Sequence, residues 1–278
     1  MPSNTDITVA QLSRLVGLPD APVIIDVRDE DDYPADPRFL PGGVHRDYRA
    51  VADWSRDWPP RGSRAVIVCQ KGLKLSEGVA AFLRSRGVRA EILEGGFLAW
   101  RDAGGLLVSP AKLPPRNAEG RTVWVTRARP KIDRIACPWL IRRFVDPGAV
   151  FLYVAAPEVN AVAERFKAIP FDVDGAFWSH RGEHCTFDTM LREFGLESPG
   201  GSGALDRLAL IVRGADTARL DLAPQAAGLL AASLGLSRMY RDDLEQLEAS
   251  FALYDALYRW ARDAVGETHD WPGHVKKS

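Results

Sequence analysis

The sequence of 278 residues has few cysteines, no long hydrophobic run and almost no net charge. Its three cysteines, Cys69, Cys137 and Cys185, are too few for a disulfide framework, so each thiol needs another explanation. No apolar run reaches the roughly 18 to 20 residues of a membrane-spanning helix, and the N-terminus lacks the basic and apolar regions of a signal peptide. The net charge of −1 gives no global nucleic-acid-binding signature, although a local basic patch is compatible with it. We therefore expect a cytoplasmic protein that binds no membrane and, on its overall charge, no nucleic acid.

The composition is that of a folded protein with two domains. Hydrophobic residues make up 46% of the chain and charged residues 26%, which excludes a wholly disordered or collagen-like chain. At roughly 100 to 200 residues per domain, the length predicts two domains. The segment 104–120 carries Pro110, Pro114 and Pro115, which is typical of an extended linker. We therefore predict domains over residues 1–108 and 121–278, joined by a linker over 109–120.

The two predicted domains differ in their patterns. In the first, apolar runs at 23–27, 65–68 and 90–93 are typical of buried strands, and a helical spacing over 78–86 lies between the last two. This alternation predicts an α/β fold, a parallel sheet flanked by helices. In the second, strand-like runs at 123–126 and 150–154 are followed mostly by helical patterns, which predicts a mainly helical α+β domain. Its expected helices lie at 135–144, 158–167, 186–194, 203–213, 223–234 and 242–263.

Cys69 directly follows the strand-like run 65–68 and precedes the helical pattern. Ligands bind at the carboxyl ends of strands in open α/β sheets, and main-chain N–H groups at a helix N-terminus favour negative charge. With Lys71 and Lys74 nearby, we expect the thiol pKa to fall below its usual value of about 8.5, which would make Cys69 a nucleophile. The alternative is a buried structural cysteine, the commonest fate of an isolated one.

Four segments resemble the motifs of rhodaneses, in the order and spacing of that family. They are IDVR at 25–28, LPGGV at 40–44, VCQKG at 68–72 and LEGGFLAW at 93–100. The resemblance covers about residues 5–108 and implies a sulfurtransferase that needs no cofactor. It implies that Cys69 attacks the sulfane sulfur of thiosulfate or a similar donor and carries this sulfur as a persulfide. The acceptor would be cyanide, a thiol or a protein.

The same resemblance implies a substrate-binding loop around Cys69. Arg28 is expected to pair with Asp26 at the base of this loop, and we count it among the substrate-binding candidates. Leu75 stands where single-domain rhodaneses often carry a small hydroxyl residue, and Ser76 follows one position later. The loop is therefore either one residue longer, which in related folds accepts a larger oxyanion, or simply offset. The loop residues expected to bind substrate are Gln70, Lys71, Gly72, Leu73 and Lys74.

A basic segment opens the second domain. Residues 121–143 contain seven basic residues and a single acidic residue, Asp133. If strand 123–126 leads into the expected helix, Arg127 and Arg134 lie between the strand end and the helix start, a typical location for anion binding. The alternatives are a solvated basic face or phosphate contacts to nucleic acid.

A second polar cluster, at 179–188, contains two histidines, a thiol and two carboxylates. These are ligands of zinc and similar transition metals, so we predict a zinc or iron site. Asp216, at the end of an expected helix, could line the same pocket or simply follow a C-cap glycine. Thr186 is expected as the N-cap of helix 186–194. The alternative is a polar loop with a hydrogen-bonded histidine. The predicted metal ligands are His180 and Glu183 from the cluster, with Asp133 and Cys137 from the basic segment.

The second domain resembles the C-terminal domain of ChrB-type chromate-resistance proteins. The resemblance is carried by WVTRARPKIDRIACPWLIRRF at 124–144, SHRGE at 179–183, IVRGADT at 211–217, APQAAGL at 223–229 and YDALY at 254–258. It implies a role in resisting or sensing chromate. Our first hypothesis is a sulfurtransferase with a C-terminal oxyanion or metal site. The alternative is a chromate-responsive regulator that binds DNA or a partner without turnover.

Overall fold

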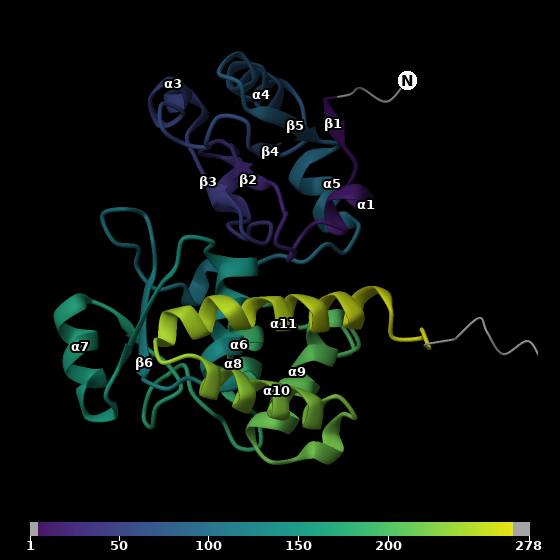
Figure 1. The fold of residues 1–278 in the computed structure, drawn as a ribbon. Coiled ribbons are helices and arrows are strands. Elements are labelled where there is room, and N and C mark those ends of the chain that lie inside the picture. Colours follow the sequence, from purple (N-terminus) through teal and green to yellow (C-terminus); the bar gives the residue numbers. More distant parts are fainter. Residues whose placement is uncertain (1–4, 269–278) are drawn as a thin grey trace, which may run out of the picture.

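The computed structural model describes residues 5–268, and the chain forms two lobes stacked on each other (Figure 1). The N-terminal lobe is a parallel sheet flanked by helices, as the sequence predicts, and the sheet has five strands in the order β1-β5-β4-β2-β3. Its strands are β1 (Asp6–Ile7), β2 (Val23–Asp26), β3 (Val44–His45), β4 (Arg64–Val68) and β5 (Arg89–Leu93). Its helices are α1 (Val9–Ser13), α2 (Asp32–Ala35), η1 (Tyr48–Ala50), α3 (Val51–Trp54), α4 (Lys74–Ser85) and α5 (Gly96–Asp102).

The two faces of this sheet bury alternate residues of each strand. Ile25 and Ile67 pack in one apolar cluster with Val79 and Leu83 of α4. Their neighbours along the strands, among them Val66, point to the opposite face and join the cluster that contains α1 and α5. Burial on both faces explains why these strands appear in the sequence as continuous apolar runs.

The C-terminal lobe is a mainly helical domain that contains strands, as predicted, and its strands form a small parallel sheet in the order β7-β6-β8. Its strands are β6 (Val123–Arg127), β7 (Val150–Val154) and β8 (Ile169–Pro170). Its longer helices are α6 (Asp133–Leu140), α7 (Val159–Phe166), α8 (Thr186–Glu193), α9 (Ala204–Asp216), α10 (Ala226–Met239) and α11 (Asp243–Asp263). Short helical turns are η2 (Pro110–Lys112), η3 (Ile141–Val145), η4 (Ala156–Glu158) and η5 (Leu220–Leu222). No helix in the described part of the chain is long and apolar enough to cross a membrane.

One local expectation about helices is confirmed with shifted ends, and another is wrong. The helix expected at 135–144 begins at Asp133 and passes at Ile141 into a π-helical turn, η3, shortly after Pro138, whose ring nitrogen cannot donate within a helix. Thr186 is the first residue of α8 rather than its N-cap. The N-cap is Cys185, which has extended backbone angles and whose N–H donates to Asp188 of the first turn at 3.0 Å.

One apolar core joins the two lobes. Val68 and Trp100 of the N-terminal lobe belong to the same buried cluster as Trp124 and Trp139 of the C-terminal lobe. The Gly42 N–H donates to the Phe144 carbonyl at 2.6 Å across the junction, and the Ser109 N–H of the linker donates to the Phe194 carbonyl at 2.8 Å. The lobes therefore fold against each other as one packed unit.

Candidate functional sites

Cys69 lies at the carboxyl end of β4, the middle strand of the N-terminal sheet, and α4 begins five residues later at Lys74. The carbonyls of Cys69 and Gln70 accept N–H donors from Phe97 and Leu98 at 2.9 and 3.1 Å, which ties the loop to the first turn of α5. This places Cys69 at the position that the sequence predicts for the nucleophile.

Two glycines let the loop pack against the turn before α5. Gly72 has a φ of +68°, and a Cβ atom there would lie 2.5 Å from the Leu93 carbonyl. Gly96 has a φ of +62°, and its Cβ would lie 2.2 Å from the Cys69 carbonyl. The motifs VCQKG and LEGGF therefore form one interlocked turn, which only residues without a side chain can build.

The loop offers donors to an anion, but the thiol itself is largely covered. In the described part of the chain, the main-chain N–H groups of Lys71, Gly72 and Leu73 donate to no protein acceptor. Lys71, Leu73 and Lys74 are exposed, whereas Cys69 is only 4% exposed and packs in the apolar cluster with Ile67 and Val79. Two polar side-chain atoms near Cys69 in the chain, Gln70 Oε1 and Ser76 Oγ, are buried with no hydrogen-bond partner among the described residues.

Arg28 is not a substrate-binding residue. Its side chain is fully buried and forms a bidentate ion pair with Asp26, with Nη2 2.6 Å from Oδ2. It also donates to the carbonyls of Asp36 and Arg38, and its guanidinium carbon Cζ lies 3.7 Å from the centroid of the Phe97 ring. All three guanidinium nitrogens donate to protein acceptors, so Arg28 stabilises the base of the loop, as its expected pairing with Asp26 indicates.

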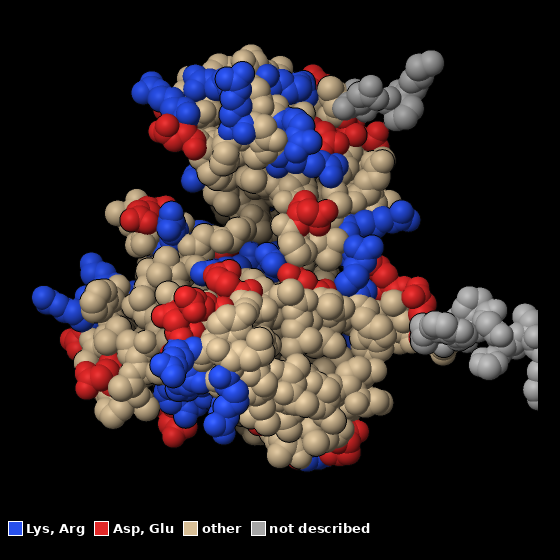
Figure 2. All heavy atoms as spheres, viewed as in Figure 1, with Lys and Arg blue, Asp and Glu red and all other residues tan. Residues whose placement is uncertain are grey.

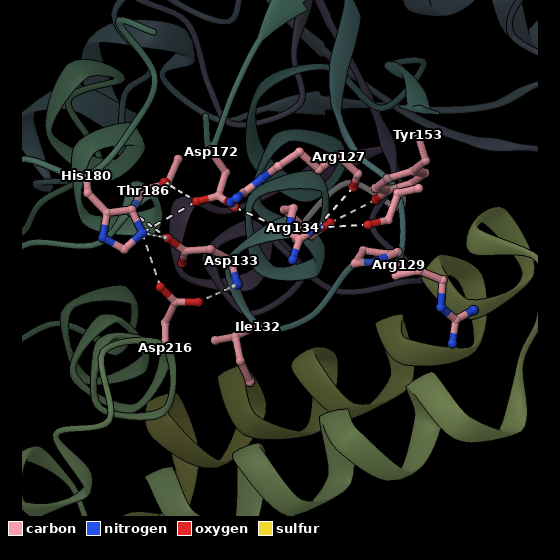
Figure 3. Close-up of polar contacts among 12 residues, drawn as sticks. Arg127, Arg129, Ile132, Asp133, Arg134, Tyr153, Asp172, His180, Thr186 and Asp216 are labelled. Atoms are coloured by element: carbon pink, nitrogen blue, oxygen red, sulfur yellow. Dashed lines mark hydrogen bonds and ion pairs between the residues drawn. The ribbon is translucent and has the colours of Figure 1, made fainter. Parts of the chain in front are cut away.

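In the C-terminal lobe, three carboxylates converge on one imidazole nitrogen (Figure 3). His180 Nε2 lies 3.2 Å from Asp216 Oδ2, 3.4 Å from Asp172 Oδ1 and 3.5 Å from Asp133 Oδ2. Asp133 begins α6, Asp216 ends α9, and Asp172 follows β8, so three separate elements supply the carboxylates. We call these four residues the acidic cluster.

Neighbouring groups hold the acidic cluster in place and leave one oxygen free. Asp133 Oδ2 accepts the Thr186 N–H of α8 at 2.5 Å, and Asp172 Oδ1 accepts the Thr186 hydroxyl at 3.0 Å. Asp133 is fully buried, and its Oδ1 has no hydrogen-bond partner among the described residues. A buried carboxylate oxygen without a donor is unfavourable unless something positive binds it.

Electrostatics in the acidic cluster favour positive charge. Hydrogen bonds to Asp172 and Asp216 raise the pKa of His180 to about 10. Burial, followed by the charges of Asp216 and Asp172, raises the pKa of Asp133 well above its ordinary value. Burial acts against ionisation of Asp172 too, but hydrogen bonds from His180 and Thr186 and two arginine charges hold its pKa below the ordinary value.

The structure brings together only part of the expected metal-ligand set. Asp133 and His180 are in the acidic cluster, but Cys137 and Glu183 are not among the ligand atoms that converge there in the described chain. Glu183 is exposed on its turn. Burial, followed by the charge of Asp133, raises the pKa of Cys137 well above its ordinary value and keeps the thiol protonated. Asp172 takes their place. The sequence does not predict Asp172 as a ligand, because this residue lies in a loop, with a φ of +51°, that only the pairing of β6 with β8 brings to the cluster.

Arg127 and Arg134 lie beside the acidic cluster and pair with Asp172 at 3.1 and 3.3 Å. Arg134 also donates to the carbonyls of Arg127 and Ala128. Burial lowers the pKa of Arg134. These two guanidinium groups neutralise the outer side of Asp172, so Arg127 and Arg134 support the acidic cluster.

Comparison with known proteins identifies both lobes. Residues 8–103 match the family of rhodanese-like domains, and residues 124–261 match the C-terminal domain of ChrB. The chain therefore contains a rhodanese-like domain followed by a ChrB C-terminal domain.

The chain is similar to the protein ChrB of Cupriavidus metallidurans, with 34% identity over 202 residues, covering 68% of this chain and 57% of that protein. It thus matches little more than half the length of this relative. Similar solved structures include a protein of unknown function from Rhodopseudomonas palustris, described as a possible tyrosine phosphatase. It is 29% identical with a TM-score of 0.33, covering 37% of this chain and 83% of that one. The human single-domain sulfurtransferase is 19% identical with a TM-score of 0.31, covering 36% of this chain and 97% of that one.

Proposed function

We propose that this protein is a sulfurtransferase that carries sulfur as a persulfide on Cys69 and acts in chromate resistance. The observation that carries this proposal is the position of Cys69, at the end of the central strand and the start of a loop. Three main-chain N–H groups of this loop have no acceptor among the residues that the structure describes. The match of the second lobe to the ChrB C-terminal domain supports the link to chromate.

The proposed reaction has two displacement steps. The Cys69 thiolate attacks the outer sulfur of thiosulfate, the sulfur–sulfur bond of the donor breaks, and sulfite leaves with the bonding electrons. An acceptor such as cyanide or a thiolate then attacks the outer sulfur of the persulfide and releases the Cys69 thiolate. The loop N–H groups and the start of α4 stabilise the negative charge before and after transfer.

The test is the rate of thiocyanate formation from thiosulfate and cyanide, together with mass mapping of the persulfide. Wild-type protein is expected to gain one sulfur atom on the peptide that contains Cys69. Cys69→Ser is expected to lose the activity while its unfolding temperature stays within a few degrees of wild type. A Cys137→Ser variant is the matched control and should keep the activity, because Cys137 lies in the other lobe. Equal rates for wild type and Cys69→Ser would overturn the proposal.

We also propose that the acidic cluster binds a divalent transition metal such as zinc or iron. Asp133, Asp172 and His180 each offer a ligand atom, all within 4.8 Å of one another, and Asp216 Oδ2 adjoins them. Mixed carboxylate and imidazole ligands suit such metals. The free Oδ1 of Asp133 is the observation that favours this second function.

Metal binding is tested by titrating chelator-treated protein with Zn²⁺, Fe²⁺ or Mn²⁺ in a calorimeter. We expect roughly one equivalent to bind and expect Asp133→Asn to weaken binding at least about 10-fold, because a charged ligand is lost. Glu183→Gln is the control and should bind as wild type does. Binding of the metals with equal affinity by Asp133→Asn and wild type would assign the metal to another place.

A further inference from the structure

A groove separates the two lobes on one side of the molecule. Figure 2 shows the surface hollowed at the waist, where Lys and Arg side chains gather between the lobes. The groove encloses a cavity of about 520 Å³, lined by the segments 16–24, 41–46, 116–121 and 142–148 and by Trp58. It includes the start of β2, whereas Cys69 follows the other end of the neighbouring parallel strand β4. None of its lining residues belongs to the acidic cluster.

The groove is rich in guanidinium groups, and nearly all of them are paired. Five arginines line it, against two carboxylates, Glu119 and Asp146. Arg116 pairs with Asp146 at 3.1 Å and Arg143 with Asp255 at 2.8 Å. Arg142 pairs with Glu248, and Arg121 lies 3.6 Å from Glu119. The fifth arginine is Arg46.

Arg46 differs from the others because no carboxylate in the described chain pairs with it and no protein acceptor takes its side-chain donors. Its guanidinium lies over the Trp58 ring, 5.2 Å from the centroid, and the residue is only partly exposed. Burial and the like charge of Arg116 both lower the pKa of Arg46. A guanidinium that is partly removed from water beside another cation is unfavourable unless an anion binds it.

We propose that this groove binds a small molecule through a phosphate- or sulfate-like oxyanion group, with Arg46 as the principal anion ligand. The planar fork of a guanidinium matches two oxygens of such a group. The cavity is larger than a bare ion needs and lies in the range of about 300 to 1,000 Å³ that is typical of small-molecule sites. The apolar wall formed by Pro19, Pro22 and Pro147 suits an organic body attached to the oxyanion.

Calorimetric titration at fixed ionic strength, balanced with chloride, tests this site with four probes: sulfate, chromate, inorganic phosphate and glycerol 3-phosphate. We expect at least one probe to bind wild type with one site per chain. Arg46→Met is expected to bind that probe at least about 10-fold more weakly, because a charge-assisted bidentate contact is lost. Tighter binding of glycerol 3-phosphate than of phosphate identifies an organic ligand, and equal binding identifies a free ion.

Two variants separate ligand binding from a structural role. Arg49→Met is the matched control, because Arg49 is exposed, pairs with Glu30 and does not line the groove. It should bind the probes as wild type does. Arg46→Met should unfold in chloride buffer at the wild-type temperature or above it, and should lose the rise in unfolding temperature that the bound probe gives wild type. If no probe binds wild type, or if Arg46→Met binds as tightly as wild type, the proposal is wrong.

Discussion

At the scale of single residues, the ion pair between Arg28 and Asp26 is important because both side chains are removed from water. The Arg28 side chain is fully buried and that of Asp26 is 3% exposed. Arg28→Met leaves Asp26 buried without its partner, which costs about 3 to 5 kcal/mol. Arg38→Met is the control, since Arg38 is 46% exposed in its pair with Asp36, and should cost less than about 1 kcal/mol. Urea unfolding measures both free energies, and similar losses in the two variants would contradict this account.

The acidic cluster predicts a pH dependence of stability in chelator-treated protein. The folded-state pKa of His180 is about 10, above its unfolded value of about 6.5. Because folding favours the protonated form, the stabilisation from His180 is fully present below pH 6.5 and is lost as pH rises towards 10. The elevated pKa of Asp133 acts in the same direction. We expect the unfolding free energy to decline over this range and the His180→Gln variant to show a shallower decline. An equal slope in both would show that His180 does not carry the effect.

At the scale of elements, two glycines near the Cys69 loop should respond in opposite ways to alanine. Gly78 lies on the exposed side of α4, where an added Cβ meets nothing within 4 Å. Gly78→Ala should stabilise the protein by about 0.5 to 1 kcal/mol, because alanine restricts the unfolded chain. Gly96→Ala should destabilise it, because the new Cβ meets the Cys69 carbonyl. Thermal unfolding measures both, and stabilisation by both variants would show that the interlocked turn tolerates side chains.

An element can be predicted from the sequence when its own residues show a recognisable apolar pattern. The long helices and the apolar strands β2, β4, β5, β6 and β7 were predicted because their apolar residues repeat with a helical spacing or form short runs. The two-residue strands β1, β3 and β8 are too short to carry any pattern. Cys69, its loop and the start of α4 are contiguous in the chain, so their order was predictable from the sequence, whereas the packing of the loop against the turn before α5 is a tertiary contact.

The sequence predicts only part of the acidic cluster, because its residues come from segments far apart in the chain. His180 was found because it lies in a polar run, and Asp133 because it lies four residues before Cys137 and would share one face with it in a helix. Asp172 joins them through the two-residue strand β8 and its own left-handed backbone conformation, and neither feature can be recognised from the sequence. Which residues form such a site is determined by tertiary contacts between segments that are far apart in the chain.

At the scale of the whole molecule, two sequence families share one apolar core. The buried cluster includes Leu12 of α1 and Phe97 of α5 together with Phe187 of α8 and Tyr254 of α11. Neither lobe can therefore bury its apolar surface alone. The groove that contains Arg46 also depends on this shared core, because residues of both lobes line the groove.

A shared core predicts that the lobes unfold together, and Gly17 offers a way to separate them. Gly17 has a φ of +76°, and a Cβ atom there would lie 2.3 Å from the Phe144 ring of the other lobe. Gly175 has nearly the same φ, +77°, but nothing within 4 Å of its Cβ position, so Gly175→Ala carries the backbone strain without the clash. We expect wild type and Gly175→Ala to show a single calorimetric transition. Gly17→Ala should unfold at a lower temperature with a broadened or divided transition, because the clash loosens the junction between the lobes. Two transitions in wild type would show that the lobes are energetically independent despite their common core.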